Sequence, residues 1–294
     1  MTELLAFITS LRHPENSANY GRVEALLQAS LGSMAGQSVQ DRVAVIVGNR
    51  EPSFTLPAGA RFVRVDFPPP SAVKGPQTGR EAVLLDKGTK LAVALLTARE
   101  HGPTHVMAVD ADDFVSRKIA AHVARNPGVA GWYVTSGWRY SAERASVRPQ
   151  PEFYRHCGTS HIVRTDLFRA PDLDPLRVTQ AEIAEAFGSR LHHLLASHVT
   201  VVEYLAAHGS PLRPLPFPGA LYAVGTGENH SGISMGGLGR PVGARMSAEF
   251  AVPPTPLTPV SIARAVLPSR RAFSARLSPL RVPRRRGPAF RSER

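Results

Sequence analysis

Three carboxylates, Asp110, Asp112 and Asp113, stand within four residues at the end of a short apolar run, residues 105–109. A glycine–proline pair precedes the run, which indicates a buried strand. Carboxylates this close repel one another and lose hydration, and a bound Mg²⁺ or Mn²⁺ removes that cost because both ions prefer hard oxygen ligands. The pattern predicts a metal site at a strand end. The alternative is an acidic turn in which Asp113 or Ser116 caps the following helix.

Two of the four lysines of the chain, Lys87 and Lys90, stand near the predicted start of a helix over residues 87–100. Their spacing of three residues puts them on one helix face. At a helix N-terminus such side chains can meet phosphate or a nucleotide, with the help of the helix dipole. The alternative is a solvated helix face, and the scarcity of lysine in this chain favours the functional interpretation.

Polar residues also follow the first two predicted strands. Arg12 and His13 come after the strand at residues 4–9, where side chains face the ligand crevice of an α/β sheet. Asn49 follows the strand at residues 42–48. It is a candidate for reading the edge of a base or ribose, and the alternative is a turn residue.

The elements that must position these residues follow the order β-α-β-β-α-β-α-β. This order predicts a mostly parallel sheet flanked by helices. Apolar runs predict the strands, and apolar positions at helical spacing predict the helices. The expected strands cover residues 4–9, 42–48, 61–65, 105–109 and 131–140, and the expected helices cover residues 19–34, 87–100 and 116–125.

The second half of the chain is less regular. Residues 225–239 are rich in glycine and predict a mobile loop. From residue 252 onward Pro, Arg and Ser dominate, a composition that does not bury enough surface to order itself alone. Expected elements before these segments are strands at residues 161–164 and 221–224 and helices at residues 181–187 and 192–208.

The net charge of +12 is unevenly distributed. Residues 261–294 hold ten arginines and one acid, so this segment carries +9 and leaves +3 for residues 1–260. The basic character therefore belongs mostly to the tail, and it does not by itself make the whole protein a nucleic-acid-binding one.

Cysteine content and hydropathy bear on location. A single cysteine, Cys157, excludes an internal disulfide framework and fits a reducing compartment. The N-terminal residues carry no basic leader, and no stretch approaches the roughly 20 apolar residues needed to span a bilayer. These features predict a cytoplasmic protein whose basic tail is available for contact with an anionic membrane.

Over residues 3–232 the chain resembles the GT-A glycosyltransferases, in particular small bacterial family-two-like sugar transferases. The most specific part is the strand-plus-acid segment 106–113, which looks like the DxD(D) motif of that fold. Residues 86–90 lie where such enzymes carry a nucleotide-contacting segment. Residues 157–160 look like the glycine-containing segment on the acceptor side of the family.

The resemblance implies transfer of a sugar, with inversion, from a nucleoside-diphosphate sugar to a hydroxyl of a glycan or lipid-linked acceptor, in surface polysaccharide or glycoconjugate synthesis. It implies a GT-A-like domain over residues 1–250, with a nucleotide-binding half at 1–115 and an acceptor half at 116–250, and a disordered tail at 251–294. The implied cofactor is Mn²⁺ or Mg²⁺. Implied ligands of the metal are Asp110, Asp112 and the late His230, and implied contacts of the nucleotide sugar are Thr9, Arg12, Asn49, Lys87, Lys90 and Asp110.

The catalytic base departs from the family pattern. Many members carry a Glu-Asp pair before the late histidine, and the aspartate of this pair is the base, but residues 161–230 contain no such pair. Either a histidine, His192 or His193, takes the proton from the acceptor hydroxyl, or a nearby acid, Glu182 or Glu185, serves instead.

Two other functions compete with sugar transfer. A nucleotidyltransferase shares an α/β nucleotide fold and metal-binding carboxylates, but it usually places a glycine-rich basic loop straight after the first strand. Here that position holds residues 11–15, LRHPE, which argues against it. The third function is nonspecific nucleic-acid binding through the arginine-rich tail.

Overall fold

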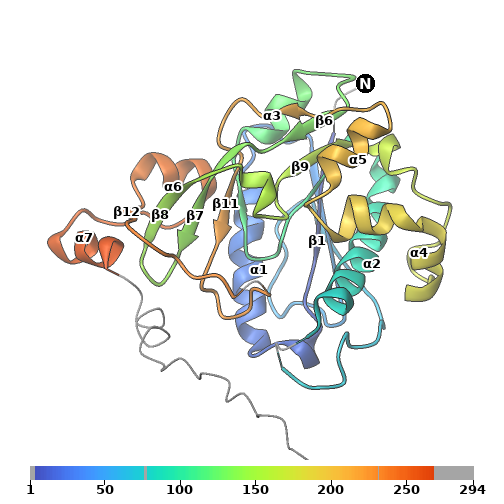
Figure 1. Cartoon of the computed structure of the whole chain (residues 1–294), viewed down its shortest axis with the longest axis horizontal. Coiled ribbons are helices and arrows are strands. Elements are labelled where there is room, and N and C mark those ends of the chain that lie inside the picture. The colour runs from blue at the N-terminus through green and yellow to red at the C-terminus, as the bar shows by residue number, and fades with distance from the viewer. Residues whose placement is uncertain (1–3, 76–77, 231, 268–294) are drawn as a thin grey trace, which may run out of the picture.

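A seven-stranded sheet forms the centre of the protein (Figure 1). The computed structural model describes residues 4–75, 78–230 and 232–267. The strands of the central sheet are β1 (Leu5–Ser10), β2 (Arg42–Gly48), β3 (Ala60–Arg64), β4 (His105–Ala108), β6 (Gly131–Tyr133), β9 (His161–Arg164) and β10 (Arg213–Pro214). Their order is β10-β6-β9-β4-β1-β2-β3.

Most neighbouring strands of this sheet run parallel, and β9 is antiparallel to both β4 and β6. The chain builds outward from β1 in two directions, because β1 pairs with β2 on one side and with β4 on the other. Open α/β sheets bind ligands beyond the carboxyl ends of the strands at such a switch point. The predicted mostly parallel α/β sheet is confirmed.

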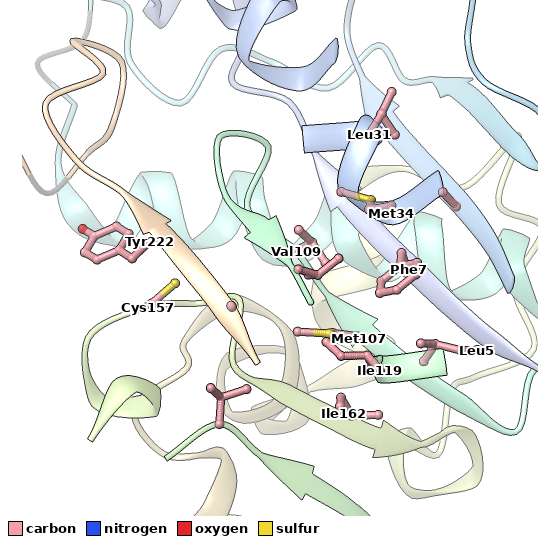
Figure 2. Close-up of a cluster of buried hydrophobic side chains, with 14 of the residues drawn as sticks. Leu5, Phe7, Leu31, Met34, Met107, Val109, Ile119, Cys157, Ile162 and Tyr222 are labelled. Carbon is pink, nitrogen blue, oxygen red and sulfur yellow. The ribbon is translucent and has the colours of Figure 1, made fainter. Parts of the chain in front are cut away.

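Helices cover both faces of the central sheet. Along β1, Phe7 packs with α1, whereas Ile8 packs with α2, because successive side chains of a strand point to opposite faces. Figure 2 shows Leu31 and Met34 of α1 beside Phe7 and Met107 of the sheet. The helices on the first face are α1 (Tyr20–Ala35) and α3 (Ile119–Ala124), and those on the second are α2 (Arg80–Ala98), α4 (Gln180–Phe187), η5 (Leu191–Ala196) and α5 (Val201–Ala207).

A second, five-stranded sheet lies beside the first, in the order β12-β8-β7-β11-β5. The acidic turn after β4 leads directly into β5, so it joins the two sheets. Phe250 of α6 packs in the apolar cluster of this sheet. The elements here are β5 (Phe114–Val115), β7 (Ser136–Ser141), β8 (Ser146–Pro151), β11 (Ala220–Ala223), β12 (Arg240–Pro241) and α6 (Ala244–Phe250); short 3-10 turns are η1 (Pro14–Asn16), η2 (Arg99–His101), η3 (Phe153–Arg155) and η4 (Thr165–Phe168).

Three expected elements differ from those observed. The strand expected at residues 131–140 is divided between β6 and β7, which belong to different sheets. The helix expected at residues 192–208 is interrupted between η5, a π-helix, and α5. Helix α2 begins seven residues earlier than expected, at a glycine N-cap without a side-chain hydrogen bond. Lys87 and Lys90 therefore lie inside α2, away from the N-terminal dipole.

The chain after residue 250 also differs from the expected disordered tail. Residues Pro259–Val266 form helix α7, whose first turn is held by reciprocal hydrogen bonds between Thr258 and Ser261. Ala265 is fully buried, and this packing against the protein supplies the order that the composition alone does not predict. The remainder of the predicted tail, residues 268–294, lies outside the described residues. Over the described ranges, no helix is long and apolar enough to cross a membrane.

Candidate active site

A cavity of about 500 Å³ opens where β1 and β4 end, at the switch point of the central sheet. Its volume lies in the range typical of small-molecule sites. Segments far apart in the sequence contribute to its wall: the end of β1, helix α2, the acidic turn, and the loops after η5 and β11. Of the residues and segments singled out in the sequence, those lining it are Arg12, Asp86, Lys87, Asp110, Asp112, Cys157, Gly158 and His230.

Asp110 and Lys87 form an ion pair across the cavity wall. Burial by itself would lower the pKa of Lys87, but the adjacent Asp110 carboxylate raises this pKa above its ordinary value, so the ammonium stays charged. Gly158 lies directly against the pair. A Cβ at this position would come within 2.7 Å of Asp110 Oδ2 and 2.8 Å of Lys87 Nζ, so a larger residue here would displace the ends of these two side chains.

The two remaining acids of the turn have different surroundings. Asp112 lines the cavity, and burial followed by repulsion from Asp110 raises its pKa to about 6. Asp113 is fully buried outside the cavity, where its carboxylate accepts hydrogen bonds from Thr159 Oγ1 (2.6 Å), Cys157 Sγ (2.9 Å) and the backbone N–H of Ala223 (2.9 Å). Asp113 is therefore a structural anchor and not a helix cap.

The acidic turn offers two carboxylates to a divalent cation. Burial, followed by repulsion from Asp110, raises the pKa of Asp112, and a cation between the two acids would offset both effects. Within the ranges the structure describes, no group of three or more His, Cys, Asp or Glu side chains is arranged to hold a metal. Mg²⁺ is commonly bound through one or two carboxylates and completes its shell with substrate phosphates and water. Asp110 and Asp112 fit an ion bound in this way.

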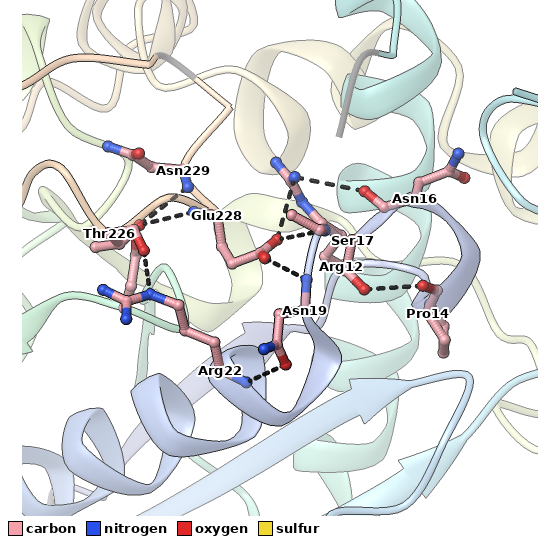
Figure 3. A network of polar contacts seen from close by, with 11 residues as sticks. Arg12, Pro14, Asn16, Ser17, Asn19, Arg22, Thr226, Glu228 and Asn229 are labelled. Atoms are coloured by element: carbon pink, nitrogen blue, oxygen red, sulfur yellow. Dashed lines mark hydrogen bonds and ion pairs between the residues drawn. The ribbon is translucent and has the colours of Figure 1, made fainter. Parts of the chain in front are cut away.

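The loop after β11 is fixed at its start, in contrast to the mobility expected from its glycines. Glu228 accepts hydrogen bonds from the backbone N–H groups of Ala18 (3.2 Å) and Asn19 (2.7 Å), where α1 begins (Figure 3). Its carboxylate also lies 3.6 Å from the Arg12 guanidinium. The negative charge at a helix N-terminus is favourable. No local sequence pattern indicates this role of Glu228, because its partners are more than 200 residues away in the sequence.

Thr226 connects this loop to the acidic turn. Its hydroxyl accepts from the backbone N–H groups of Glu228 (3.2 Å) and Asn229 (3.0 Å) and donates to Asp112 Oδ2 (3.4 Å). Arg22 of α1 donates to the Thr226 carbonyl (Figure 3). This network brings His230, the next residue of the loop, to the mouth of the cavity, where it remains exposed.

Three predicted nucleotide contacts do not line the cavity. Lys90 is fully buried and donates to the Asp86 carboxylate (2.8 Å) and the Leu11 carbonyl (2.9 Å). The side-chain amide N–H of Asn49 donates hydrogen bonds to the carbonyls of Val65 (3.1 Å) and Phe67 (2.8 Å), as expected of a turn residue. Thr9 is buried within β1.

The predicted catalytic bases also lie elsewhere. His193 stacks on Tyr204 with ring centroids 4.8 Å apart, and His192 is exposed. Glu182 reaches back to Thr179 in a capping box at the start of α4. Glu185 is exposed on the same helix. None of these side chains lines the cavity, because the helix expected to present them ends before it.

The interruption between η5 and α5 brings Ser197 and His198 into the cavity instead. Gly88 of α2 permits this approach, since a Cβ there would come within 2.9 Å of Ala196 Cβ. Burial, followed by the positive charge of Lys87, lowers the pKa of His198. The sequence does contain a signal for the break, because a serine and β-branched residues at 197–200 disfavour a helix.

Comparisons with known proteins give only distant similarities. No protein-family model and no curated sequence matches the chain. Among solved structures, TarS residues 1–349 from S. aureus share 13% identity over 75% of this chain and 60% of that one, with a TM-score of 0.41. A putative nucleotide-diphospho-sugar transferase from Desulfovibrio desulfuricans G20 shares 13% over 76% and 82% of the two chains, with a TM-score of 0.33.

Mouse xyloside xylosyltransferase 1 shares 11% identity over 73% of this chain and 85% of that one, with a TM-score of 0.35. The chain spans 60% of the length of the TarS fragment. At these identities and TM-scores the similarities carry no functional argument. The functional argument rests on the cavity.

Proposed function

We propose that this protein is a GT-A-like, metal-dependent glycosyltransferase that moves a sugar from a nucleoside-diphosphate sugar to a hydroxyl acceptor. The observation that carries the proposal is the cavity at the switch point, where Asp110 and Asp112 face the same space as Arg12 and Lys87. This mixture of charges suits a diphosphate bound together with a divalent cation. In this proposal, the hydroxyl acceptor is a substrate of surface polysaccharide or glycoconjugate synthesis.

Departure of the nucleoside diphosphate develops negative charge on its phosphate oxygens. Lys87 and Arg12 stabilise this charge, because fixed cations in a partly closed site need no reorganisation when the bond breaks. Asp110 and Asp112 would hold the cation, which supplies further neutralisation of the leaving diphosphate when bound. We include His230 as a third ligand. Partial desolvation at the cavity mouth, followed by the positive charges of Arg12 and Arg80, lowers its pKa, which favours the neutral imidazole that binds metals.

The acceptor hydroxyl must lose a proton as it attacks the anomeric carbon. His198 is the base in this proposal, in place of His192, His193 or Glu182. If its Nε2–H donates to the Arg155 carbonyl (3.4 Å), Nδ1 is the basic nitrogen that takes the proton. The lowered pKa of His198 keeps it neutral near pH 7, as a base must be. A single displacement of this kind inverts the anomeric centre.

Donor binding is expected to require metal and to weaken in acid. Nucleoside-diphosphate sugars should raise Tm only when Mn²⁺ or Mg²⁺ is present, because Asp110 and Asp112 would hold the ion and the ion would neutralise the diphosphate. Below pH 6 the raised pKa of Asp112 means that protons compete with the metal, so apparent metal affinity should fall about tenfold per pH unit.

A screen of nucleotide sugars by thermal shift, with Mn²⁺ or chelator, at about pH 7.5 and about pH 5, measures both effects. The products of turnover distinguish related reactions. Release of nucleoside diphosphate supports sugar transfer, whereas consumption of a nucleoside triphosphate with release of pyrophosphate would assign the cavity to a nucleotidyltransferase. Equal donor binding with and without metal contradicts the metal requirement.

The His198→Ala variant is expected to lower kcat about a hundredfold or more, the usual contribution of a general base, with little change in donor affinity. His193→Ala is the matched control, because His193 stacks on Tyr204 outside the cavity. Its kcat should stay within a few fold of the wild type. Unchanged kcat in His198→Ala would remove this histidine from the mechanism.

A further inference from the structure

Helix α7 packs against the rest of the protein through one helix face. Ser261 and Ala265 are the most buried residues of the helix. Arg144, only 2% exposed, donates to the carbonyls of Ala265, Met235 (2.9 Å) and Gly237 (3.0 Å). A buried guanidinium that binds the carbonyls at a helix C-terminus satisfies groups left open there and favours the helix dipole. The orientation of α7 is therefore set by the fold.

The opposite side of α7 is apolar and exposed. Pro259, Ile262, Ala263 and Val266 recur at the spacing that places residues on one helix face. More than half of the exposed large apolar side chains among the described residues gather on this helix or next to it. We call them the α7 patch: Leu238, Leu257, Val260, Ile262, Val266 and Leu267.

Leu238 joins the patch because its neighbour Gly239 donates to the Ala265 carbonyl (3.0 Å). In Figure 1, α7 lies at the outer edge of the molecule, on the side opposite to α4. Soluble proteins rarely leave such apolar groups together without a partner.

The sequence that follows α7 indicates the chemistry of the partner. Residues 268–294 contain nine arginines and one acid, Glu293, for a formal charge of +8. Apolar residues, among them Phe273, Leu277 and Phe290, are interspersed with these arginines. A nucleic acid would match the arginines but not the apolar patch. A second copy of a chain with a net charge of +12 would be repelled.

We propose that the α7 patch and the arginine-rich segment after it dock the protein onto an anionic lipid surface. The apolar side chains enter the boundary between headgroups and acyl chains, and the arginines attract the lipid phosphates. Two modest contributions of this kind add to stable but reversible attachment. The inference is independent of the reaction proposed for the cavity.

Co-sedimentation of the full-length protein with vesicles tests the proposal. Phosphatidylcholine vesicles that contain phosphatidylglycerol should bind the protein, and pure phosphatidylcholine vesicles should bind it much less. The double variant Val260→Glu, Val266→Glu should lower the partition coefficient at least about tenfold, because each side chain loses the benefit of apolar burial. Truncation after Leu267 should lower it at least about a hundredfold through loss of the arginines.

The matched control replaces two other exposed apolar residues, far from α7 in the sequence, Val73→Glu and Leu176→Glu, which should leave vesicle binding unchanged. An unchanged Tm shows that each variant is folded. Wild-type binding by the α7 double variant would overturn the proposal and assign attachment to the arginines alone. Binding of RNA without binding of phosphatidylglycerol vesicles, or loss of a dimer in the α7 double variant without loss of vesicle binding, would overturn it as well.

Discussion

The Asp112→Asn variant is expected to lose at least about a hundredfold in sugar transfer. Asparagine keeps the shape of the side chain but removes the charge that faces the cavity beside Asp110. The same replacement removes a charge that burial, followed by repulsion from Asp110, makes unfavourable, so the protein without metal should be slightly more stable near neutral pH. Turnover measured across a Mn²⁺ titration, with the Tm of each variant, separates loss of catalysis from loss of folding.

Asp113→Asn is the matched control, because it makes the same chemical change one residue away. Asp113 is buried outside the cavity, and its carboxylate accepts hydrogen bonds from Cys157, Thr159 and the Ala223 backbone, so its replacement should act on folding and not on a bound cation. Activity should stay within about tenfold of the wild type. If the replacement has an effect, we expect it to be a lower Tm. Full activity of Asp112→Asn, or of the wild type in excess chelator, would exclude a catalytic metal at the acidic turn.

The strands that build the cavity were predictable because each is a continuous apolar run with a polar residue at its end. The runs at β1, β2 and β4 match the observed strands closely, and β1 and β4 place Arg12 and Asp110–Asp112 at one edge of the sheet. Such runs are typical of parallel strands covered on both faces. Their signal is local, so one sequence suffices to read it.

What could not be predicted depends on contacts between distant segments. Helix α2 starts at Arg80, and its N-cap Gly79 has no side chain to form a capping hydrogen bond, so the helix start is not apparent in the sequence. Glu228 acquires its role only when the loop after β11 meets the start of α1. His198 enters the cavity where the helix is interrupted after η5, and Gly88 permits the close approach of η5 to α2. Local sequence patterns do not reveal such contacts between distant segments.

The roles of Lys87 and Lys90 also depend on contacts that the sequence does not reveal. They lead to the second prediction with a large expected effect, a loss of folding stability in a Lys90 variant. The sequence assigns both lysines to one helix face and one role, whereas the structure pairs Lys87 with Asp110 at the cavity and encloses Lys90 with Asp86. Lys90→Met should lower the free energy of unfolding by about 3–5 kcal/mol, because Asp86 would then be left as an unpaired buried carboxylate. Urea denaturation near neutral pH measures this loss.

The pH dependence and a double variant identify the cause. Burial raises the pKa of Asp86 even in the presence of Lys90, so without the lysine this carboxylate should protonate more readily. The folded variant then binds a proton that the unfolded chain releases, and its stability should recover as pH falls. Adding Asp86→Leu to Lys90→Met should restore most of the lost stability, since a well-packed apolar pair can replace a buried ion pair.

Lys87→Met is the matched comparison on the same helix. Lys87 keeps 23% of its side chain exposed, and its removal leaves Asp110 in contact with solvent and with any bound cation. Its loss should therefore cost activity, at least about tenfold, more than stability. The two lysines, three residues apart, would then have different roles: Lys87 would act in turnover and Lys90 in folding stability. If Lys90→Met kept wild-type stability and lost donor binding instead, Lys90 would have to reach the nucleotide, and the buried pair with Asp86 would not describe the working protein.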